Sequence, residues 1–227
     1  MTRWLAFLLL VVLGASPVAA RADWTRVIAA TPEGGYLIGN PNAPVRVIEY
    51  FSLTCTHCRQ FVETGLPPFK ANYVATGKVR LELRNFVLNQ HDFVASLLMK
   101  CGSPAAAVRY YSAVYADHDR FLAGALDMAP DAIARIEAAP PERRIPVLAR
   151  EAGIARWFVA HGFPQARVDF CLTDKGGQDR LVALRRMGIE RDSIQGTPGF
   201  VVNGKTVDGA TWDQLEPALR AALGTSR

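Results

Sequence analysis

Residues 45–58, VRVIEYFSLTCTHC, decide the fold, because an apolar run here ends at a pair of cysteines. The run 45–51 is rich in β-branched and aromatic residues and predicts a buried strand. Residues 59–64 contain no Gly or Pro and can begin a helix. Cys55 and Cys58 would then share one face of its first turn, close enough to bond each other reversibly. The helix N-terminus also favours a thiolate at Cys55 through its free N–H groups and its dipole.

The first 22 residues have the pattern of a secretory signal peptide. Arg3 supplies a positive charge, residues 4–15 are almost entirely apolar, and Ala20 and Ala22 are small residues of the kind that signal peptidase requires. The apolar stretch is shorter than the about 20 residues of a transmembrane span. We therefore expect cleavage after Ala22, with Ala20 as the second choice. An uncleaved N-terminal anchor is the alternative.

Composition limits the class of protein. Removal of residues 1–22 reduces the formal net charge from +5 to +3, and no segment dense in Lys and Arg stands out. We therefore do not expect the protein to bind nucleic acid. About 205 residues remain, which is enough for one large domain or for a domain that carries an insertion.

All four cysteines, Cys55, Cys58, Cys101 and Cys171, lie in the part of the chain that would be exported. An oxidising compartment and an even number of cysteines favour disulfides. A zinc site that includes His57 is the competing interpretation. Zinc sites usually have a second closely spaced ligand pair, whereas Cys101 and Cys171 stand alone and far apart.

The elements around the cysteines predict a βαβ unit. The helix after Cys58 should be broken near Pro67 and Pro68 and resume over residues 69–76. Residues 79–87 alternate apolar and polar side chains and predict a second strand. Two strands joined by a helix must be parallel, with a right-handed crossover.

The rest of the chain is mostly helical. Ala-rich helical patterns follow at residues 93–101, 104–116, 130–138, 144–159 and 178–187. A strand at 199–202, a turn at Asn203 and Gly204, a strand at 205–207 and a helix at 212–223 end the pattern. This order predicts an α/β protein, a thioredoxin fold with an inserted all-helical domain. We place the signal peptide at 1–22, the first part of the thioredoxin fold at 23–90, the helical domain at 91–187 and the second part at 188–227.

Three segments resemble the DsbA-type periplasmic thiol:disulfide oxidoreductases. Residues 47–58 (VIEYFSLTCTHC) are similar to the active-site segment of that family, residues 77–80 (GKVR) to the start of its next strand, and residues 196–204 (GTPGFVVNG) to its cis-proline loop and hairpin. The resemblance extends from about residue 40 to residue 223 and points to the DsbA/DsbG-like subgroup with a second cysteine pair. The chain differs from the Trp-Cys-Gly-Pro-Cys motif of thioredoxins, and it has Thr197 where the prototype oxidase has Val.

The resemblance implies roles for the residues of the motif. Cys55 is the attacking thiol with a low pKa, and Cys58 is the buried thiol that resolves the mixed disulfide. His57 should stabilise the Cys55 thiolate, and Thr56 is placed with the substrate-binding residues. Glu49 is expected to be a buried acid beneath the site that assists proton transfer. The alternatives are a static disulfide, a surface histidine without a role and a Glu49 that faces the sheet edge.

The resemblance also implies a cis peptide bond before Pro198, with Thr197 offering backbone groups to an extended substrate. Cys101 and Cys171 are expected to form a structural disulfide in the helical domain, and two free buried thiols are the alternative. The remaining histidines and a group of tyrosines are assigned to ordinary packing: His91, His118, His161, Tyr110, Tyr111 and Tyr115.

These inferences predict an exported, periplasmic, monomeric thiol:disulfide oxidoreductase that introduces disulfide bonds into folding proteins. It would use neither a metal nor a cofactor. By resemblance, a DsbB-like, quinone-linked membrane protein would reoxidise it. One alternative is a reductase or isomerase that uses the same site. A second alternative is a peptide-binding chaperone or metal-binding module without turnover.

Overall fold

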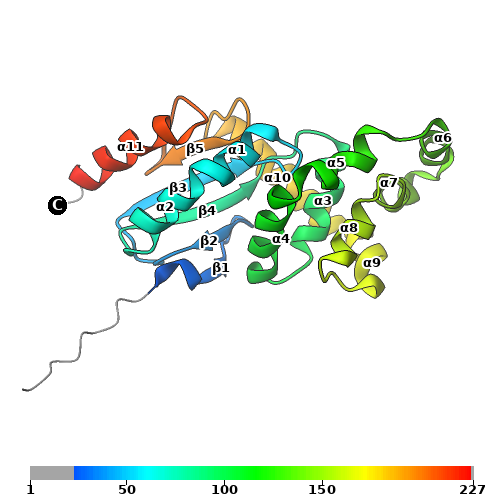
Figure 1. Cartoon of the computed structure of the whole chain (residues 1–227), viewed down its shortest axis with the longest axis horizontal. Helices are drawn as coiled ribbons and strands as arrows, with labels where there is room; N and C mark the ends of the chain where they lie inside the picture. The colour runs from blue at the N-terminus through cyan, green and yellow to red at the C-terminus, as the bar shows by residue number, and fades with distance from the viewer. Residues whose placement is uncertain (1–22, 226–227) are drawn as a thin grey trace, which may run out of the picture.

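A mixed six-stranded sheet lies at the centre of this computed structural model, which describes residues 23–225 (Figure 1). Its order is β1-β2-β4-β3-β5-β6. The strands are β1 (Ile28–Ala30), β2 (Tyr36–Ile38), β3 (Val45–Phe51), β4 (Val79–Asn85), β5 (Gly199–Val202) and β6 (Lys205–Thr206). β3 and β4 are parallel and all other neighbours are antiparallel, so the predicted βαβ unit is confirmed. The expected signal peptide, residues 1–22, lies outside the described residues.

The connection from β3 to β4 stays helical through its two prolines. α1 (Thr56–Thr64) is followed by α2 (Leu66–Phe69) and by a π-helical turn, Lys70–Val74. The expected break near Pro67 and Pro68 is wrong, because the interruption is at Gly65 and both prolines lie in the first turn of α2. A proline is tolerated there, since the first N–H groups of a helix have no partner within it. A Cβ at Gly65 would lie 2.7 Å from the Phe61 ring, so only glycine lets the chain pass this point closely.

Eight α-helices lie between β4 and β5 in the described chain. They are α3 (Gln90–Lys100), α4 (Pro104–Ala116), α5 (His118–Leu126), α6 (Pro130–Ala138), α7 (Arg144–Glu151), α8 (Ile154–Ala160), α9 (Val168–Thr173) and α10 (Lys175–Glu190). The predicted helix 144–159 is two helices, because Gly153 has a left-handed φ of 71° that ends the first one. α5 and α9 were not predicted. The thioredoxin fold with a helical insertion is confirmed (Figure 1), whereas the domain boundaries stay predictions.

The two faces of β3 pack against different helices. On one face, Ile48 and Tyr50 form a small apolar cluster with Phe86. α10 can approach this cluster closely because residue 188 is glycine: a Cβ there would lie 2.9 Å from the Phe86 ring and 3.0 Å from the Tyr50 ring. The main core lies on the other face, where α1 contacts β5 through the rings of Phe61 and Phe200, whose centroids are 4.7 Å apart. α11 (Trp212–Thr225) packs against β3 and β5. None of the helices within residues 23–225 is long and apolar enough to cross a membrane.

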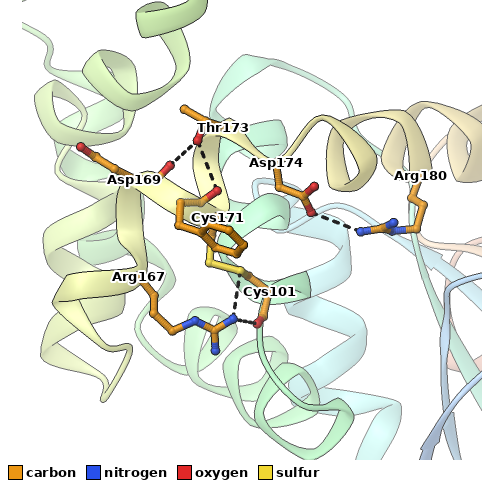
Figure 2. The surroundings of a disulfide bond; sticks show 8 residues. Cys101, Arg167, Asp169, Cys171, Thr173, Asp174 and Arg180 are labelled. Atoms are coloured by element: carbon orange, nitrogen blue, oxygen red, sulfur yellow. Dashed lines mark hydrogen bonds and ion pairs between the residues drawn. A yellow bond between two sulfur atoms is a disulfide. The ribbon is translucent and has the colours of Figure 1, made fainter.

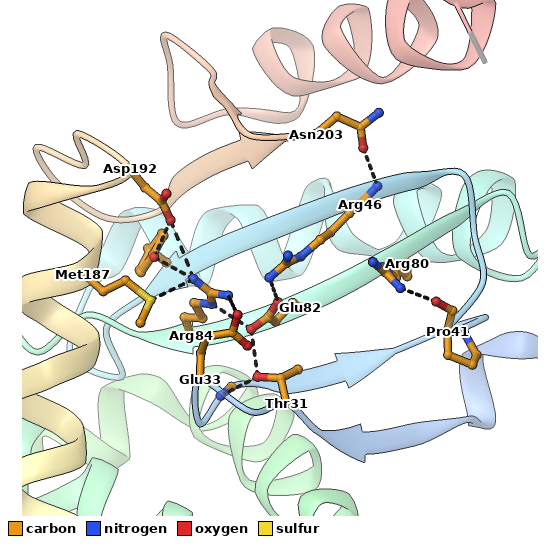
Figure 3. A network of polar contacts seen from close by, with 12 residues as sticks. Thr31, Glu33, Pro41, Arg46, Arg80, Glu82, Arg84, Met187, Asp192 and Asn203 are labelled. Atoms are coloured by element: carbon orange, nitrogen blue, oxygen red, sulfur yellow. Dashed lines mark hydrogen bonds and ion pairs between the residues drawn. The ribbon is translucent and has the colours of Figure 1, made fainter.

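A hairpin that the sequence analysis missed, β1 with β2, extends the sheet beyond β4, and a buried polar network holds it there (Figure 3). Glu82 and Arg84 on β4 are 2% and 0% exposed, although alternation suggests an open face for them. Arg84 Nε donates to Glu82 Oε1 over 2.7 Å, and Thr31 Oγ1 donates to the same oxygen over 2.9 Å. Tyr50 Oη donates to Asp192 Oδ2 over 2.6 Å, and Arg84 Nη1 donates to Tyr50 Oη over 3.1 Å. The network thereby links the hairpin to the loop that follows α10.

A disulfide joins two helices of the insertion (Figure 2). Cys101, the C-terminal cap of α3, is bonded to Cys171 of α9, which lies 70 positions further along the chain, and their Cα atoms are 5.7 Å apart. Arg167 Nη2 donates to the Cys101 carbonyl over 3.1 Å. The bond therefore closes a loop that includes five further helices of the insertion, α4 to α8.

We predict that a Cys101→Ala/Cys171→Ala variant is less stable than the wild type by about 4 kcal/mol, because a disulfide that closes so long a loop restricts the unfolded chain. Urea unfolding of the oxidised proteins measures the difference. Peptide mapping of unreduced wild type should recover the two cysteines in one linked fragment. A loss below about 1 kcal/mol would contradict the clamp.

Candidate active site

The two cysteines of the motif lie at the N-terminus of α1, directly after the loop that follows β3. Cys55 is the N-cap residue of the helix, in an extended conformation, and Cys58 lies in its first turn. Both are free thiols. Cys55 is 8% exposed and Cys58 is completely buried. Cys55 is therefore the less buried of the two thiols, and Cys58 lies beneath it.

The surroundings of Cys55 lower the pKa of its thiol to about 5, from a usual value near 9.0. The largest cause is a hydrogen bond from the Cys58 thiol, followed by the Thr197 side chain and the backbone N–H groups of Cys58 and His57, while partial burial opposes the shift. The pKa of Cys58 is raised well above its usual range by burial, by its bond to Cys55 and by the negative charges of Cys55 and Glu49. The pKa values of the two thiols are therefore shifted in opposite directions.

Thr56 and His57, the residues between the cysteines, are both exposed. The His57 imidazole makes no hydrogen bond or ion pair with any residue of the described range, 23–225. Its effect on the pKa of Cys55 comes through its backbone N–H at the start of the helix. A role for the charge of His57 stays a prediction, as does substrate binding by Thr56.

The loop before β5 faces the first cysteine. The peptide bond between Thr197 and Pro198 is cis, and the Cys55 thiol donates to the Thr197 carbonyl oxygen over 3.1 Å. The Thr197 hydroxyl is buried and makes no hydrogen bond within residues 23–225, so its O–H is free to turn toward the Cys55 thiolate and lower the pKa of that thiol. A cavity of about 470 Å³ adjoins Pro198 and is lined by residues 193–199 and 206–210.

Glu49 lies on β3 beneath the helix that carries the cysteines. β3 is a central strand between β4 and β5, so the interpretation of Glu49 as an edge residue is wrong. The side chain is completely buried; Tyr111 Oη donates to its Oε1 over 2.7 Å, and Oε2 has no partner within residues 23–225. Burial raises the pKa of Glu49 to about 8, the Tyr111 bond opposes this, and the Cys55 charge adds to it. A neutral carboxyl can therefore exist here at neutral pH.

Three residues of the helical insertion, which the sequence analysis did not connect with the site, hold the loop before Cys55. Asp92 Oδ1 of α3 accepts a hydrogen bond from the Leu53 backbone N–H over 3.0 Å. Tyr115 Oη of α4 donates to the Ser52 carbonyl over 2.7 Å, and His118 Nε2 of α5 lies 3.1 Å from the Leu53 carbonyl oxygen. Burial raises the pKa of Asp92 to about 6.

Two tyrosines of the insertion do more than pack in its core, because their hydroxyls bond to the active-site region. Tyr111 and Tyr115 do pack as expected, with ring centroids 5.1 Å apart, but their hydroxyls reach Glu49 and the Cys55 loop. No local motif marks them, because their partners lie more than 60 positions away. Among residues 23–225, no cluster of three or more His, Cys, Asp or Glu is placed to hold a metal ion.

Comparisons with known proteins agree with this geometry. The model of the thioredoxin family matches residues 31–221. A protein of Rickettsia prowazekii named as a protein-disulfide oxidoreductase is 24% identical over 200 residues, which cover 88% of this chain and 65% of that protein. A similarly named protein of Rickettsia conorii is 28% identical over 199 residues, 87% of this chain and 64% of its own length. The chain thus spans slightly less than two thirds of these relatives.

Solved structures have the same architecture. The crystal structure of a protein-disulfide isomerase from Novosphingobium aromaticivorans has a TM-score of 0.75 and 26% sequence identity, and the match covers 82% of this chain and 96% of that one. The alpha-DsbA1 protein of Wolbachia pipientis has a TM-score of 0.63 and 22% identity, over 87% and 94% of the two chains. The chain belongs to the thioredoxin family, and its fold is that of the DsbA-type proteins.

Proposed function

We propose that the protein is a thiol:disulfide oxidoreductase that donates a disulfide between Cys55 and Cys58 to folding proteins. The observation that carries the proposal is the opposite shift of the two sulfurs: the pKa of Cys55 is lowered to about 5 and that of Cys58 is raised. A static disulfide needs no such difference. A pair that exchanges disulfides needs one stable thiolate that a substrate can reach and one more deeply buried thiol that resolves the intermediate.

The reaction begins at Cys55, because its side chain is 8% exposed whereas that of Cys58 is completely buried. A substrate thiolate attacks Cys55 Sγ of the oxidised protein, the bond between the two cysteines breaks, and Cys58 leaves as a thiolate. A second substrate thiolate then attacks the substrate sulfur of this mixed disulfide, which releases the substrate disulfide and Cys55 as a thiolate. Two electrons pass from the substrate to the protein. The Thr197 backbone lies beside Cys55, where an extended substrate can bond to it.

Stabilisation of the Cys55 thiolate sets the direction of exchange. The thiolate exists only in the reduced protein, so whatever stabilises it makes the disulfide form a stronger oxidant. A pKa of about 5 in place of 9.0 favours the reduced protein by roughly 3 kcal/mol at pH 7, on the order of 60 mV. This supports donation of disulfides over their reduction.

Glu49 fits the role of a proton carrier for the buried sulfur. When Cys58 leaves as a thiolate, its charge is buried, and burial disfavours the charged form. A neutral Glu49, with its pKa near 8, can give this thiolate a proton. During reoxidation the carboxylate can take the proton back before Cys58 attacks the new mixed disulfide.

The location and partners of the protein belong to the same proposal. The pattern of residues 1–22 supports export to the periplasm, where folding proteins with free thiols are the substrates. A DsbB-like, quinone-linked membrane protein is the proposed oxidant of the Cys55–Cys58 pair, and we propose a monomer. An isomerase is the second candidate, because a structural relative carries that name.

We predict that the reduced protein shows a thiolate absorbance transition with a midpoint near pH 5, and that a Thr197→Val variant raises this midpoint. Valine cannot donate a hydrogen bond to the sulfur, so the reduced state loses stability and the reduction potential becomes more negative. Absorbance against pH and redox state against glutathione measure both quantities. Thr64→Val, at an exposed residue at the other end of α1, is the control for the same substitution away from the sulfur. A wild-type midpoint at or above 8 would contradict the strong-oxidant interpretation.

We predict that a Glu49→Gln variant gains stability relative to the wild type as the pH rises from about 5 to 8. A folded-state pKa near 8, above the unfolded value of 4.5, means that folding of the wild type must suppress ionisation of Glu49 in this range. The unfolding free energy of the wild type should therefore fall relative to the variant by about 1.4 kcal/mol per pH unit. Urea unfolding of the reduced proteins measures it. Because its hydroxyl bond lowers the pKa of Glu49, a Tyr111→Phe variant should extend the pH range of the loss to higher pH, and a stability difference that does not depend on pH would contradict a raised pKa.

The activity itself is tested with the oxidised protein and a reduced, unfolded protein that gains activity when its disulfides form. We expect the wild type to restore that activity, a Cys55→Ser variant to lose at least a hundredfold in rate, and the Cys101→Ala/Cys171→Ala variant to remain active. A potential well above the about −270 mV of thioredoxin supports an oxidase, whereas a potential near that value supports a reductase. Full activity of Cys55→Ser would favour a chaperone.

A further inference from the structure

The buried acid Glu49 has a single hydrogen-bond partner within residues 23–225, and that partner comes from the helical insertion. In the sheet, Glu49 is paired with Leu83 of β4 and with Phe200 of β5, and both of these apolar side chains are completely buried. The partner is Tyr111 of α4, whose hydroxyl donates to Glu49 Oε1 over 2.7 Å. The polar environment of the acid therefore depends on one residue that lies 62 positions away in the chain.

Aromatic packing fixes the position of the Tyr111 hydroxyl. The side chain is buried, and its ring meets the Phe51 ring edge to face, with centroids 4.9 Å apart. The Tyr115 ring contacts it in the same way, with centroids 5.1 Å apart. Edge-to-face contacts of this kind restrict the orientation of a ring. Because the hydroxyl oxygen is rigidly attached to the ring, it stays beside Glu49.

The number of hydrogens at this contact decides which oxygen of Glu49 carries the acid proton. A tyrosine hydroxyl has one hydrogen to donate, and Tyr111 donates it to Oε1. In the reverse arrangement, with Glu49 as the donor, the Tyr111 hydrogen would be buried without an acceptor, which is costly. The proton of neutral Glu49 therefore lies on Oε2, the oxygen that is buried and has no partner within residues 23–225.

The ionisable groups that face Glu49 are the two thiols of α1 and two tyrosines of α4. Burial raises the pKa of Cys58, and the negative charges of Cys55 and Glu49 add to this increase, so the acid lies within electrostatic reach of the buried sulfur. Burial also raises the pKa of Tyr115, and the charge of Glu49 contributes there too. The pKa of Glu49 itself is raised by burial and by the Cys55 charge, and the Tyr111 hydrogen bond opposes this. Of these groups only Tyr111 stabilises the Glu49 carboxylate.

We propose that Tyr111 is a positioning residue for proton transfer at Cys58: its hydroxyl holds Glu49 Oε1, so that Oε2 is the atom that gives the proton to the buried sulfur and takes it back. This inference rests on the proposed oxidoreductase function and deepens its mechanism. The helical insertion then takes part in the chemistry through α4, in addition to holding the loop before the first cysteine.

The proposed transfer balances in both directions. When Cys58 leaves as a thiolate, the O–H bond at Glu49 Oε2 breaks, an S–H bond forms at Cys58, and the Tyr111 hydrogen bond stabilises the carboxylate that remains. During reoxidation the carboxylate takes this proton back. The Cys58 thiolate then attacks Cys55 Sγ of the mixed disulfide, and the sulfur of the oxidant leaves as a thiolate.

Infrared spectroscopy of the reduced protein tests the position of the proton. The C=O stretch of neutral Glu49, measured below the transition near pH 8, is identified by its absence in Glu49→Gln. We expect Tyr111→Phe to shift this band to higher frequency, because the carbonyl oxygen Oε1 loses its donor. Tyr110→Phe is the matched control one position earlier on α4, where the ring packs against Phe158 and Phe163, and should leave the band in place. An unshifted band in Tyr111→Phe overturns the inference.

Closure of a mixed disulfide tests the consequence for Cys58. The disulfide between Cys55 and glutathione is formed at low pH, where Cys58 keeps its proton, and a jump to higher pH starts the attack by Cys58; acid quenching and mass spectrometry follow the loss of glutathione. We expect the pH profile of closure in Tyr111→Phe to move upward by about one to two pH units, because the carboxylate loses a hydrogen bond. At pH 7 closure should be about tenfold slower. Tyr110→Phe should keep the wild-type profile.

A double-mutant cycle separates this role from a structural one. In a Glu49→Gln background, Tyr111→Phe should have no further effect on closure, because the tyrosine acts through the carboxyl group. An equal slowing with and without Glu49 overturns the inference, as does a pH profile that Tyr111→Phe leaves in place. Glutathione is the only substrate in this experiment. A wild type whose closure depends on Tyr111 but which oxidises no protein thiols therefore contradicts only the proposed function.

Discussion

The chemistry of this protein depends on the unequal environments of two sulfurs that lie one helical turn apart. Cys55 meets the free N–H groups of α1, the Cys58 thiol and the Thr197 side chain, all of which stabilise negative charge. Cys58 is enclosed by the core above Glu49, and burial there disfavours its thiolate. A pair with equal environments would have no preferred point of attack. The strand, the helix and the loop before β5 must all be in place for the difference to exist.

The helical insertion is part of this arrangement. Tyr111 bonds the acid beneath the site, and Asp92, Tyr115 and His118 bind the backbone of the loop that leads into Cys55. Buried polar groups of this kind are costly unless they are paired, so each contact restricts the position of the loop strongly. The insertion therefore positions the first cysteine, and the disulfide at the C-terminus of α3 holds the same helix at its other end.

The face of the sheet away from the cysteines also acts on the site. Arg84, Glu82 and Tyr50 form a buried network that ends at Asp192, five positions before Thr197. Charged groups are accepted there because each one is paired. The loop that meets Cys55 is thus held from below, which keeps the Thr197 carbonyl 3.1 Å from the sulfur.

The sequence by itself determined the βαβ unit, most helices of the insertion and the candidate cysteines, because these depend on local periodicity and on residues close together in the chain. It also marked Glu49 through resemblance, but it could not show that the residue lies on a central strand. The interruption at Gly65, the short hairpin β1–β2 and the contacts of Asp92 and His118 were decided only by the tertiary structure. Each of these depends on which distant side chain comes near, and proximity between distant segments has no local pattern in the chain.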